Sequence, residues 1–260
     1  MLVPFLAVCV SSRISALSTQ SSSDQGIKRA GSFRILGGTI AENAAYPFMV
    51  SLRLFPNRLL CGGTIVNNRW ILTAAHCMVN ETTSMITVVA GTNMLESDGT
   101  YAWIQRVVIH PDFIGTGIRP DDIALIRLSS PLTYSSAIAA VALDMGGSES
   151  TDVTMIGWGS SRRGGPFSNR LRQYSTQILR QDMCTRRYNY VTAKQFCTRW
   201  KRGSGTCDGD SGGPLIDTRT KRQLGIASFA SIRGCGIAPD VYTRVSSYTT
   251  WIQNTINSQN

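Results

Sequence analysis

From residue 35 onward, short runs of apolar, β-branched and aromatic residues alternate with clusters of Gly, Pro, Asn and Ser. Runs of this length, separated by turn-forming residues, are typical of the strands of an all-β sandwich or barrel. We therefore expect strands at Phe48–Leu54, Gly63–Val66, Ile86–Val89, Trp103–Ile109, Ile123–Leu128, Val153–Trp158, Gly225–Phe229 and Asp240–Val245.

The apolar spacing changes at the end of the chain. Val245, Tyr248, Ile252 and Ile256 recur every three or four residues, which is the spacing that places side chains on one face of a helix. We expect a closing amphipathic helix over residues 245–256. The sequence shows no internal repeat of the solenoid kind.

The chain begins with an apolar run followed by a Ser-rich stretch. This run is shorter than the roughly 20 residues that span a bilayer, so residues 1–18 are interpreted as a secretory signal peptide. The basic n-region of such signals is missing, and the alternative is a frayed tail or a start codon placed too far downstream. Residues 19–34 are small and polar and predict a disordered pro-segment. No later stretch predicts a membrane span, and one domain is expected over residues 35–260.

Composition and charge narrow the class of protein. The chain has 260 residues and 42% hydrophobic content, which suits one compact unit or one unit of two halves. Removal of residues 1–34 takes away four basic residues and one acid, so the formal charge falls from +10 to +7. Eleven Arg and Lys residues lie between Arg162 and Arg202 against one acid, Asp182. This stretch predicts either weak polyanion binding, to sulfated glycans or nucleic acid, or a solvated basic face.

Seven cysteines are present, and six remain if Cys9 leaves with the signal peptide. An even number in an exported chain indicates disulfides, although six cysteines allow fifteen pairings. The sequence does not favour a zinc site, because no C-x-x-C occurs and the two histidines are far apart in sequence. The expected disulfide-bonded residues are Cys61, Cys77, Cys184, Cys197, Cys207 and Cys235.

Three short motifs carry the candidate chemistry: Leu72-Thr-Ala-Ala-His76-Cys77, Asp122-Ile-Ala-Leu-Ile126 and Gly209-Asp-Ser-Gly-Gly-Pro214. Attack on an amide carbonyl by a serine hydroxyl needs a base to accept its proton and a carboxylate to fix the tautomer of that base. Each motif alone is weak, because each also fits an ordinary turn or strand. Together, in the order His, Asp, Ser, they resemble the chymotrypsin/trypsin family of serine proteases.

The resemblance runs from Arg34 to near the C-terminus. It implies an all-β fold of two six-stranded antiparallel β-barrels with a C-terminal α-helix, and an active site in the cleft between the barrels. It also implies a catalytic triad of His76, Asp122 and Ser211. The family pattern selects Asp122 over its neighbour Asp121, which is then expected at the surface.

The same resemblance assigns an oxyanion hole and an activation site. The backbone N–H groups of Gly209 and Ser211 would bind the developing oxyanion. Cleavage after Arg34 would free the α-amino group of Ile35, which would fold inward and pair with Asp210. The chain is therefore expected to be an inactive precursor that needs an activating protease.

Family pairing would join Cys61 to Cys77, Cys184 to Cys197, and Cys207 to Cys235. Thr92 follows Gly91 where calcium-binding members carry a Glu, so no calcium site is expected, and neither is another metal or a cofactor. Asn80 begins a glycosylation sequon, Asn-Glu-Thr.

The expected substrate-binding residues are Gly205, Thr206, Asp208, Ser228, Phe229, Ala230 and Asp240. Members that cleave after Arg or Lys have an Asp six residues before the serine, where this chain has Gly205. Asp240 stands where those members have Gly, so the acid has moved to the opposite wall of the pocket. Elastase-like and collagenolytic members share this arrangement. We expect a preference for small or medium apolar P1 residues or broad specificity, with a basic preference as a third option, and Asp208 at the rim.

Two other classes of function compete. The first is a catalytically silent member of the fold that binds polyanions, although its triad residues are intact. The second is an esterase of another fold, whose Gly-x-Ser-x-Gly pattern fits Gly209–Gly213, but the upstream histidine reverses the order of its triad. The favoured prediction is a secreted, extracellular, monomeric endopeptidase. Its expected partners are protein or peptide substrates, an activating protease and protein protease inhibitors.

Overall fold

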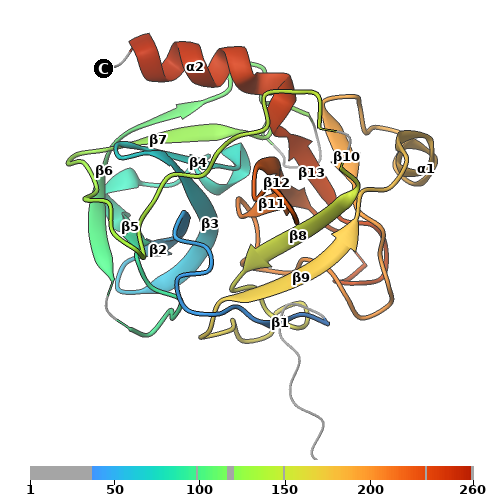
Figure 1. Ribbon diagram of the computed structural model, residues 1–260, viewed down its shortest axis with the longest axis horizontal. Coiled ribbons are helices and arrows are strands. Elements are labelled where there is room, and N and C mark those ends of the chain that lie inside the picture. The colour runs from blue at the N-terminus through green and yellow to red at the C-terminus, as the bar shows by residue number, and fades with distance from the viewer. Residues whose placement is uncertain (1–36, 98, 116–119, 149, 232, 259–260) are drawn as a thin grey trace, which may run out of the picture. The chain divides into compact units, whose positions relative to one another are not determined.

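The computed structural model describes residues 37–97, 99–115, 120–148, 150–231 and 233–258 (Figure 1). The predicted signal peptide and pro-segment, and with them Arg34 and Ile35, lie outside the described residues. All eight expected strands are present. The described residues also form five strands that were not expected: Thr39–Ile40, Trp70–Thr73, Arg172–Gln177, Gln195–Cys197 and Pro214–Asp217.

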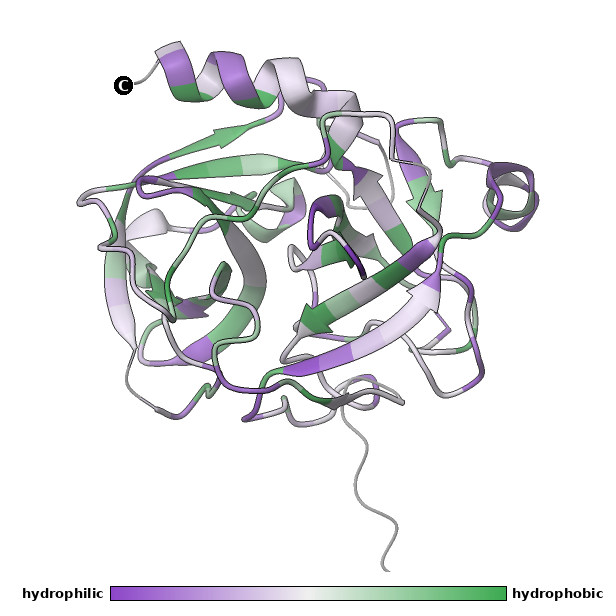
Figure 2. Ribbon diagram, viewed as in Figure 1, coloured by the Kyte–Doolittle hydropathy of each residue, from purple (hydrophilic) through white to green (hydrophobic). Residues whose placement is uncertain are grey.

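The first half of the described chain is a closed antiparallel barrel in the strand order β2-β3-β4-β7-β6-β5. Its interior is filled by branched apolar side chains such as Val50, Leu52, Ile71 and Leu125, all of which are fully buried. Figure 2 shows these strands as mainly hydrophobic. The strands are β2 (Met49–Leu54), β3 (Arg58–Asn67), β4 (Trp70–Thr73), β5 (Ile86–Ala90), β6 (Thr100–Ile109) and β7 (Ala124–Leu128).

The second half is a seven-stranded antiparallel sheet in the order β1-β9-β8-β11-β12-β13-β10. Its strands are β1 (Thr39–Ile40), β8 (Asp152–Gly157), β9 (Arg172–Gln177), β10 (Gln195–Cys197), β11 (Pro214–Asp217), β12 (Gln223–Phe229) and β13 (Val241–Arg244).

This second sheet differs from the closed six-stranded barrel that was expected. β1 is added at the edge of β9. Among the described residues, the other six strands form a ring that is closed by one isolated bridge, between Ile178 and Thr198. Ring closure at this seam is limited because β10 is only three residues long. The trypsin-like class is right, and the second barrel is incompletely closed.

Two α-helices complete the described part of the fold. α1 (Gln181–Arg187) lies between β9 and β10 and was not expected. The C-terminal helix is present as a short 3-10 turn, Val245–Tyr248, followed by α2 (Thr249–Ser258). Val245, Tyr248 and Ile252 are buried against the core of the first barrel, so the predicted apolar face is the face that packs. Within the described part of the chain, no helix is long and apolar enough to cross a membrane.

Candidate active site between the barrel and the second sheet

Strand pairing in the first barrel brings His76 and Asp122 together. β4 pairs with β7, and Thr73 lies opposite Ala124. His76 follows β4 in a 3-10 turn, Ala75–Cys77, and Asp122 lies two residues before β7, so both are at the same end of the strand pair. Asp122 Oδ1 accepts the backbone N–H of His76 at 2.9 Å, and Oδ2 lies 2.8 Å from His76 Nδ1. The carboxylate therefore fixes both the backbone and the ring of His76.

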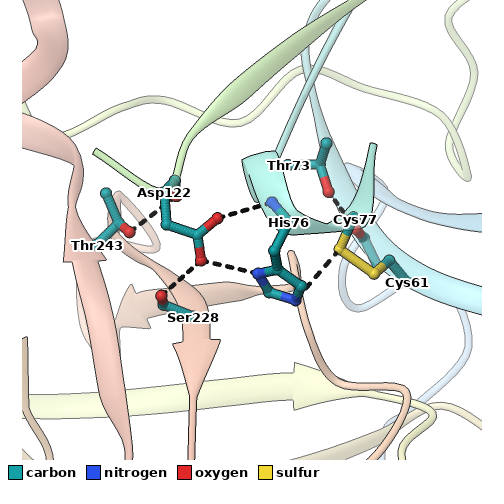
Figure 3. A network of polar contacts seen from close by, with 8 residues as sticks. Cys61, Thr73, His76, Cys77, Asp122, Ser228 and Thr243 are labelled. Carbon is teal, nitrogen blue, oxygen red and sulfur yellow. Dashed lines mark hydrogen bonds and ion pairs between the residues drawn. A yellow bond between two sulfur atoms is a disulfide. The ribbon is translucent and has the colours of Figure 1, made fainter. Parts of the chain in front are cut away.

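Asp122 is also held from the second half of the protein. The Ser228 hydroxyl in β12 donates to Asp122 Oδ2 at 2.6 Å, and the Thr243 hydroxyl in β13 donates to the backbone carbonyl of Asp122 at 2.9 Å. Figure 3 shows Asp122 between His76 on one side and Ser228 and Thr243 on the other. Asp122 is fully buried, so His76 and Ser228 replace the water that a buried carboxylate loses, while Thr243 satisfies the backbone carbonyl.

Ser211 lies in the turn before β11, next to the first barrel. Its backbone carbonyl accepts the N–H of Gly62 at 2.8 Å. Gly62 follows Cys61, which is disulfide-bonded to Cys77 beside His76. Within the described residues, Ser211 Oγ makes no hydrogen bond to His76, and His76 Nε2 lies 3.8 Å from Cys77 Sγ. In protein structures without substrate, catalytic hydrogen bonds are often long and tighten only in the complex.

The turn that carries Ser211 depends on Gly209. Its φ of +92° lies in the left-handed region, and a Cβ at this position would come within 2.9 Å of the Phe167 ring and 3.0 Å of Leu59. A side chain would therefore disturb the turn sterically and conformationally. Within the described residues, the N–H groups of Gly209 and Ser211 donate to no other backbone group.

Asp210 points away from solvent into the second half of the protein. Its Oδ1 accepts the N–H of Gly159 at 2.8 Å, and its Oδ2 accepts the N–H of Cys207 at 3.0 Å. Burial raises the pKa of Asp210 to about 7, against the lowering effect of the two N–H donors. A Cβ at Gly157 or Gly159 would overlap the carboxylate, so these glycines make the space that Asp210 occupies.

A cavity of about 150 Å³ opens beside Ser211. Its lining includes five of the seven expected substrate-binding residues, namely Thr206, Asp208, Ser228, Phe229 and Ala230. The other two, Gly205 and Asp240, do not line it. Asp208 is exposed at the rim, where its Oδ2 accepts the N–H of Gly164 at 2.7 Å.

Asp240 lies behind the cavity wall and is only 2% exposed. Its Oδ2 accepts the N–H of Thr206 at 2.7 Å, whereas Oδ1 has no hydrogen-bond partner among the described residues. Burial raises the pKa of Asp240 to about 7, and the nearby charge of Asp210 adds to this effect. A Cβ at Gly205 would come within 2.5 Å of Asp240 Oδ2. Gly205 therefore gives Asp240 its room.

Comparison with known proteins identifies the family. The profile of the Trypsin family matches residues 35–252. The chain is a member of the trypsin family. This protease is 36% identical over 221 residues to Chymotrypsin-2 of Vespa crabro, a match that covers 84% of this chain and 98% of the relative.

Two further proteins are similar to this chain. The protease is 38% identical over 232 residues to Serine protease SP24D of Anopheles gambiae, covering 86% of this chain and 81% of the relative. Its fold matches neuropsin, a serine protease expressed in the limbic system of mouse brain, with a TM-score of 0.78 and 31% identity over 85% of this chain and all of that one. The expected family, the trypsin-like fold and the serine protease class are therefore confirmed.

The protease contains the three disulfides that family pairing implied. Cys61 is bonded to Cys77, Cys184 to Cys197, and Cys207 to Cys235. The last pair also lines the cavity beside Ser211. Asn80 is exposed, with a φ of +62°, so the expected glycosylation position is accessible.

Asp121 was expected at the surface, and this expectation is wrong. The residue is buried and has a φ of +67°. Its carboxylate accepts from Lys194 Nζ at 2.6 Å and from the Tyr248 hydroxyl at 3.1 Å. The same hydroxyl accepts the Asp121 N–H at 2.9 Å. This network anchors the backbone immediately before Asp122.

The sequence analysis did not predict that Ser228 and Thr243 contact Asp122. Ser228 was expected among the substrate-binding residues, not as a donor to Asp122, and Thr243 was not singled out at all. No local signal marks either role, because both residues reach Asp122 from more than a hundred positions away in the chain.

Proposed function

We propose that this protease is a secreted endopeptidase that cleaves peptide bonds with Ser211 as nucleophile, His76 as base and Asp122 as the residue that orients the base. The observation that carries the proposal is the arrangement at Asp122. One oxygen holds the backbone of His76, and the other accepts from both His76 Nδ1 and Ser228. With the Nδ1 proton held by the carboxylate, Nε2 is left to accept the proton of Ser211.

The proposed reaction has two halves. Ser211 Oγ attacks the carbonyl carbon and its proton passes to His76 Nε2, after which the C–N bond breaks and the leaving amine takes that proton. Water then attacks the acyl-enzyme, and His76 again accepts and returns a proton, which frees the carboxylic acid and Ser211. The Gly209 and Ser211 N–H groups would stabilise the oxyanion in both halves, each by about 3 kcal/mol.

Activation by cleavage after Arg34 is supported by the environment of Asp210. Among the described residues, its buried carboxylate accepts from two backbone N–H groups and has a raised pKa. The new α-ammonium group of Ile35 would supply the missing positive charge and favour the ionised carboxylate. Because Asp210 lies between Gly209 and Ser211, this pairing would set the turn that holds both oxyanion donors.

The primary pocket supports a small or medium apolar P1 residue. The cavity is small, and the acid behind it is buried and engaged by Thr206. A basic P1 side chain needs a carboxylate that it can reach, because an unpaired buried ammonium group is costly. Broad specificity is the second candidate, since Ala230 at the cavity lining is larger than a glycine only by one methyl group.

Export is supported by the three disulfides, which form and persist in oxidising compartments. The proposed partners are protein or peptide substrates, an activating protease and protein inhibitors.

A library of peptides with different P1 residues tests the function and its specificity. Protein cleaved after Arg34 is compared with the same protein carrying Ser211→Ala. We expect turnover of substrates with Ala, Val or Leu at P1, and none by the variant. Cleavage confined to Arg or Lys would refute the apolar pocket. Absence of turnover throughout, with retained binding to heparin, would favour the silent polyanion-binding alternative.

A further inference from the structure

Another cavity lies at α1 and at the residues that follow β10, and neither Asp122 nor Ser211 lines it. It measures about 370 Å³ and is lined by Leu179, Arg180, Met183, Arg199 and Trp200. We name these five residues the α1 groove. In Figure 1, α1 and the neighbouring end of β10 mark its position. None of its residues lines the cavity beside Ser211, so the proposed mechanism does not use them.

The α1 groove is built on a fixed frame. The bridge between Ile178 and Thr198 joins the two segments that form it. Leu179 N–H donates to the Cys197 carbonyl at 2.8 Å, and Arg199 N–H donates to the Gln177 carbonyl at 2.7 Å. The Cys184–Cys197 disulfide links α1 to β10. A surface held in this way loses little conformational entropy when it binds a partner.

The groove exposes large apolar side chains. Met183 and Trp200 are 47% and 48% exposed, although residues of these types are usually buried. Leu179 also lines the groove and is partly buried against a core cluster. We call the part of the lining formed by the Met183 thioether and the Trp200 indole the apolar floor. Met is flexible, and both residue types are enriched in protein interfaces.

The rim of the groove is basic. The side chain of Arg180 is 83% exposed, and Asp182 is shared between it, at 3.1 Å, and Arg186, at 3.7 Å. One carboxylate thus faces two guanidinium groups. Arg199 is exposed, as are Lys201 and Arg202 just after Trp200. The rim therefore carries a surplus of positive charge around an apolar floor.

We propose that the α1 groove binds an acidic polypeptide segment that carries one bulky apolar side chain, presented by a protein that this protease recognises. Guanidinium groups pair with carboxylates in two parallel hydrogen bonds, and the apolar side chain would lie against Met183 and Trp200. A sulfated glycan would satisfy the arginines but has no apolar group for the floor. The floor is the feature that distinguishes the two ligands. This inference does not rest on the proposed catalytic function.

Binding is tested on the full chain carrying Ser211→Ala, which prevents cleavage of the probe. The probe is a short fluorescein-labelled peptide of Asp and Glu with one central Phe, titrated by fluorescence anisotropy. We expect Arg180→Ala/Arg199→Ala and Trp200→Ala each to weaken binding by about tenfold. Replacing the Phe of the peptide with Ser should weaken it by a similar factor.

Matched variants control for charge and for loss of an exposed aromatic. Arg58→Ala/Arg219→Ala removes the same charge from exposed positions elsewhere, and Trp103→Ala removes another exposed tryptophan. Both should leave the dissociation constant within about twofold of the parent. Trp200→Phe should restore most of the binding, which separates loss of the floor from misfolding.

Three results would overturn the proposal. The first is absence of peptide binding, and the second is equal binding of the Phe and Ser peptides with no effect of Trp200→Ala. The third is a sulfated oligosaccharide that displaces the peptide and whose own binding depends on Arg180 and Arg199 but not on Trp200. That result would identify the surface as a polyanion site.

Discussion

The contacts of Asp240 predict how the stability of the protein depends on pH. The carboxyl group is buried, its Oδ2 accepts from Thr206, and its Oδ1 has no partner among the described residues. The perturbation is Asp240→Asn, which removes the ionisable group and retains an oxygen for the Thr206 N–H. Asn is close in shape to Asp, so the packing against Gly205 changes little.

The magnitude follows from the pKa of Asp240. Its folded value is about 7, above the unfolded value of about 3.9. The folded state therefore binds the proton more tightly, and stability is lost as the pH rises from the unfolded to the folded pKa. The loss is complete above about pH 7 and amounts to about 4 kcal/mol. In Asp240→Asn, an unpaired buried amide costs about 1–3 kcal/mol at every pH.

The variant should therefore be less stable than the parent by about 1–3 kcal/mol near pH 4 and more stable by a similar amount near pH 8. The assay is urea unfolding followed by tryptophan fluorescence, with Ser211→Ala in both proteins to prevent autolysis. Asp210 also has a raised pKa, but it is present in both proteins, so its contribution largely cancels in the stability difference. A stability difference that stays constant between these pH values would refute the reasoning.

Three other substitutions test separate parts of the account. Asp122→Asn keeps the bond to the His76 N–H but turns an amide donor toward Nδ1, so kcat/KM on a peptide ester should fall by about 10⁴; a loss below about tenfold would contradict the role of Asp122. Lys194→Met leaves the buried Asp121 without its ammonium partner and should lower the free energy of unfolding at neutral pH by about 1–2 kcal/mol; an unchanged urea midpoint would contradict this. Gly205 has a φ of +134°, and a side chain there would come close to Asp240. Gly205→Asp should therefore lower Tm without creating cleavage after Arg, whereas Gly205→Asp/Asp240→Gly should permit cleavage after Arg. Efficient cleavage after Arg by the single variant would show that the acid can be accommodated.

The sequence predicted the strands whose apolar side chains fill a core. β2, β5 and β7 have dense branched residues and were expected close to their observed bounds. β9 reads Arg-Gln-Tyr-Ser-Thr-Gln and is mostly half-buried, so it has no apolar pattern to detect. β11 begins with Pro214, the last residue of the glycine-rich motif, so its start is not recognisable among turn-forming residues.

The candidate site was predictable only where a motif carried it. His76, Asp122 and Ser211 each lie within a recognisable motif, and the disulfide pairing followed from the family. The burial of Asp121 had no such signal, because Lys194 and Tyr248 are 73 and 127 positions away in the chain. From the sequence alone, an acid next to the motif acid looks like a surface residue, because its distant partners are not known.

The central claim is that Ser211 is a nucleophile activated by His76. The most direct measurement is covalent labelling of the protein cleaved after Arg34 with a fluorophosphonate, followed by intact mass and peptide mapping. A serine that has a positioned base displaces fluoride and forms a stable phosphonyl ester, whereas ordinary serines do not react. We predict one adduct, located on Ser211, that is absent in His76→Ala. An unlabelled protein, or labelling that persists at the same rate in His76→Ala, would contradict the account.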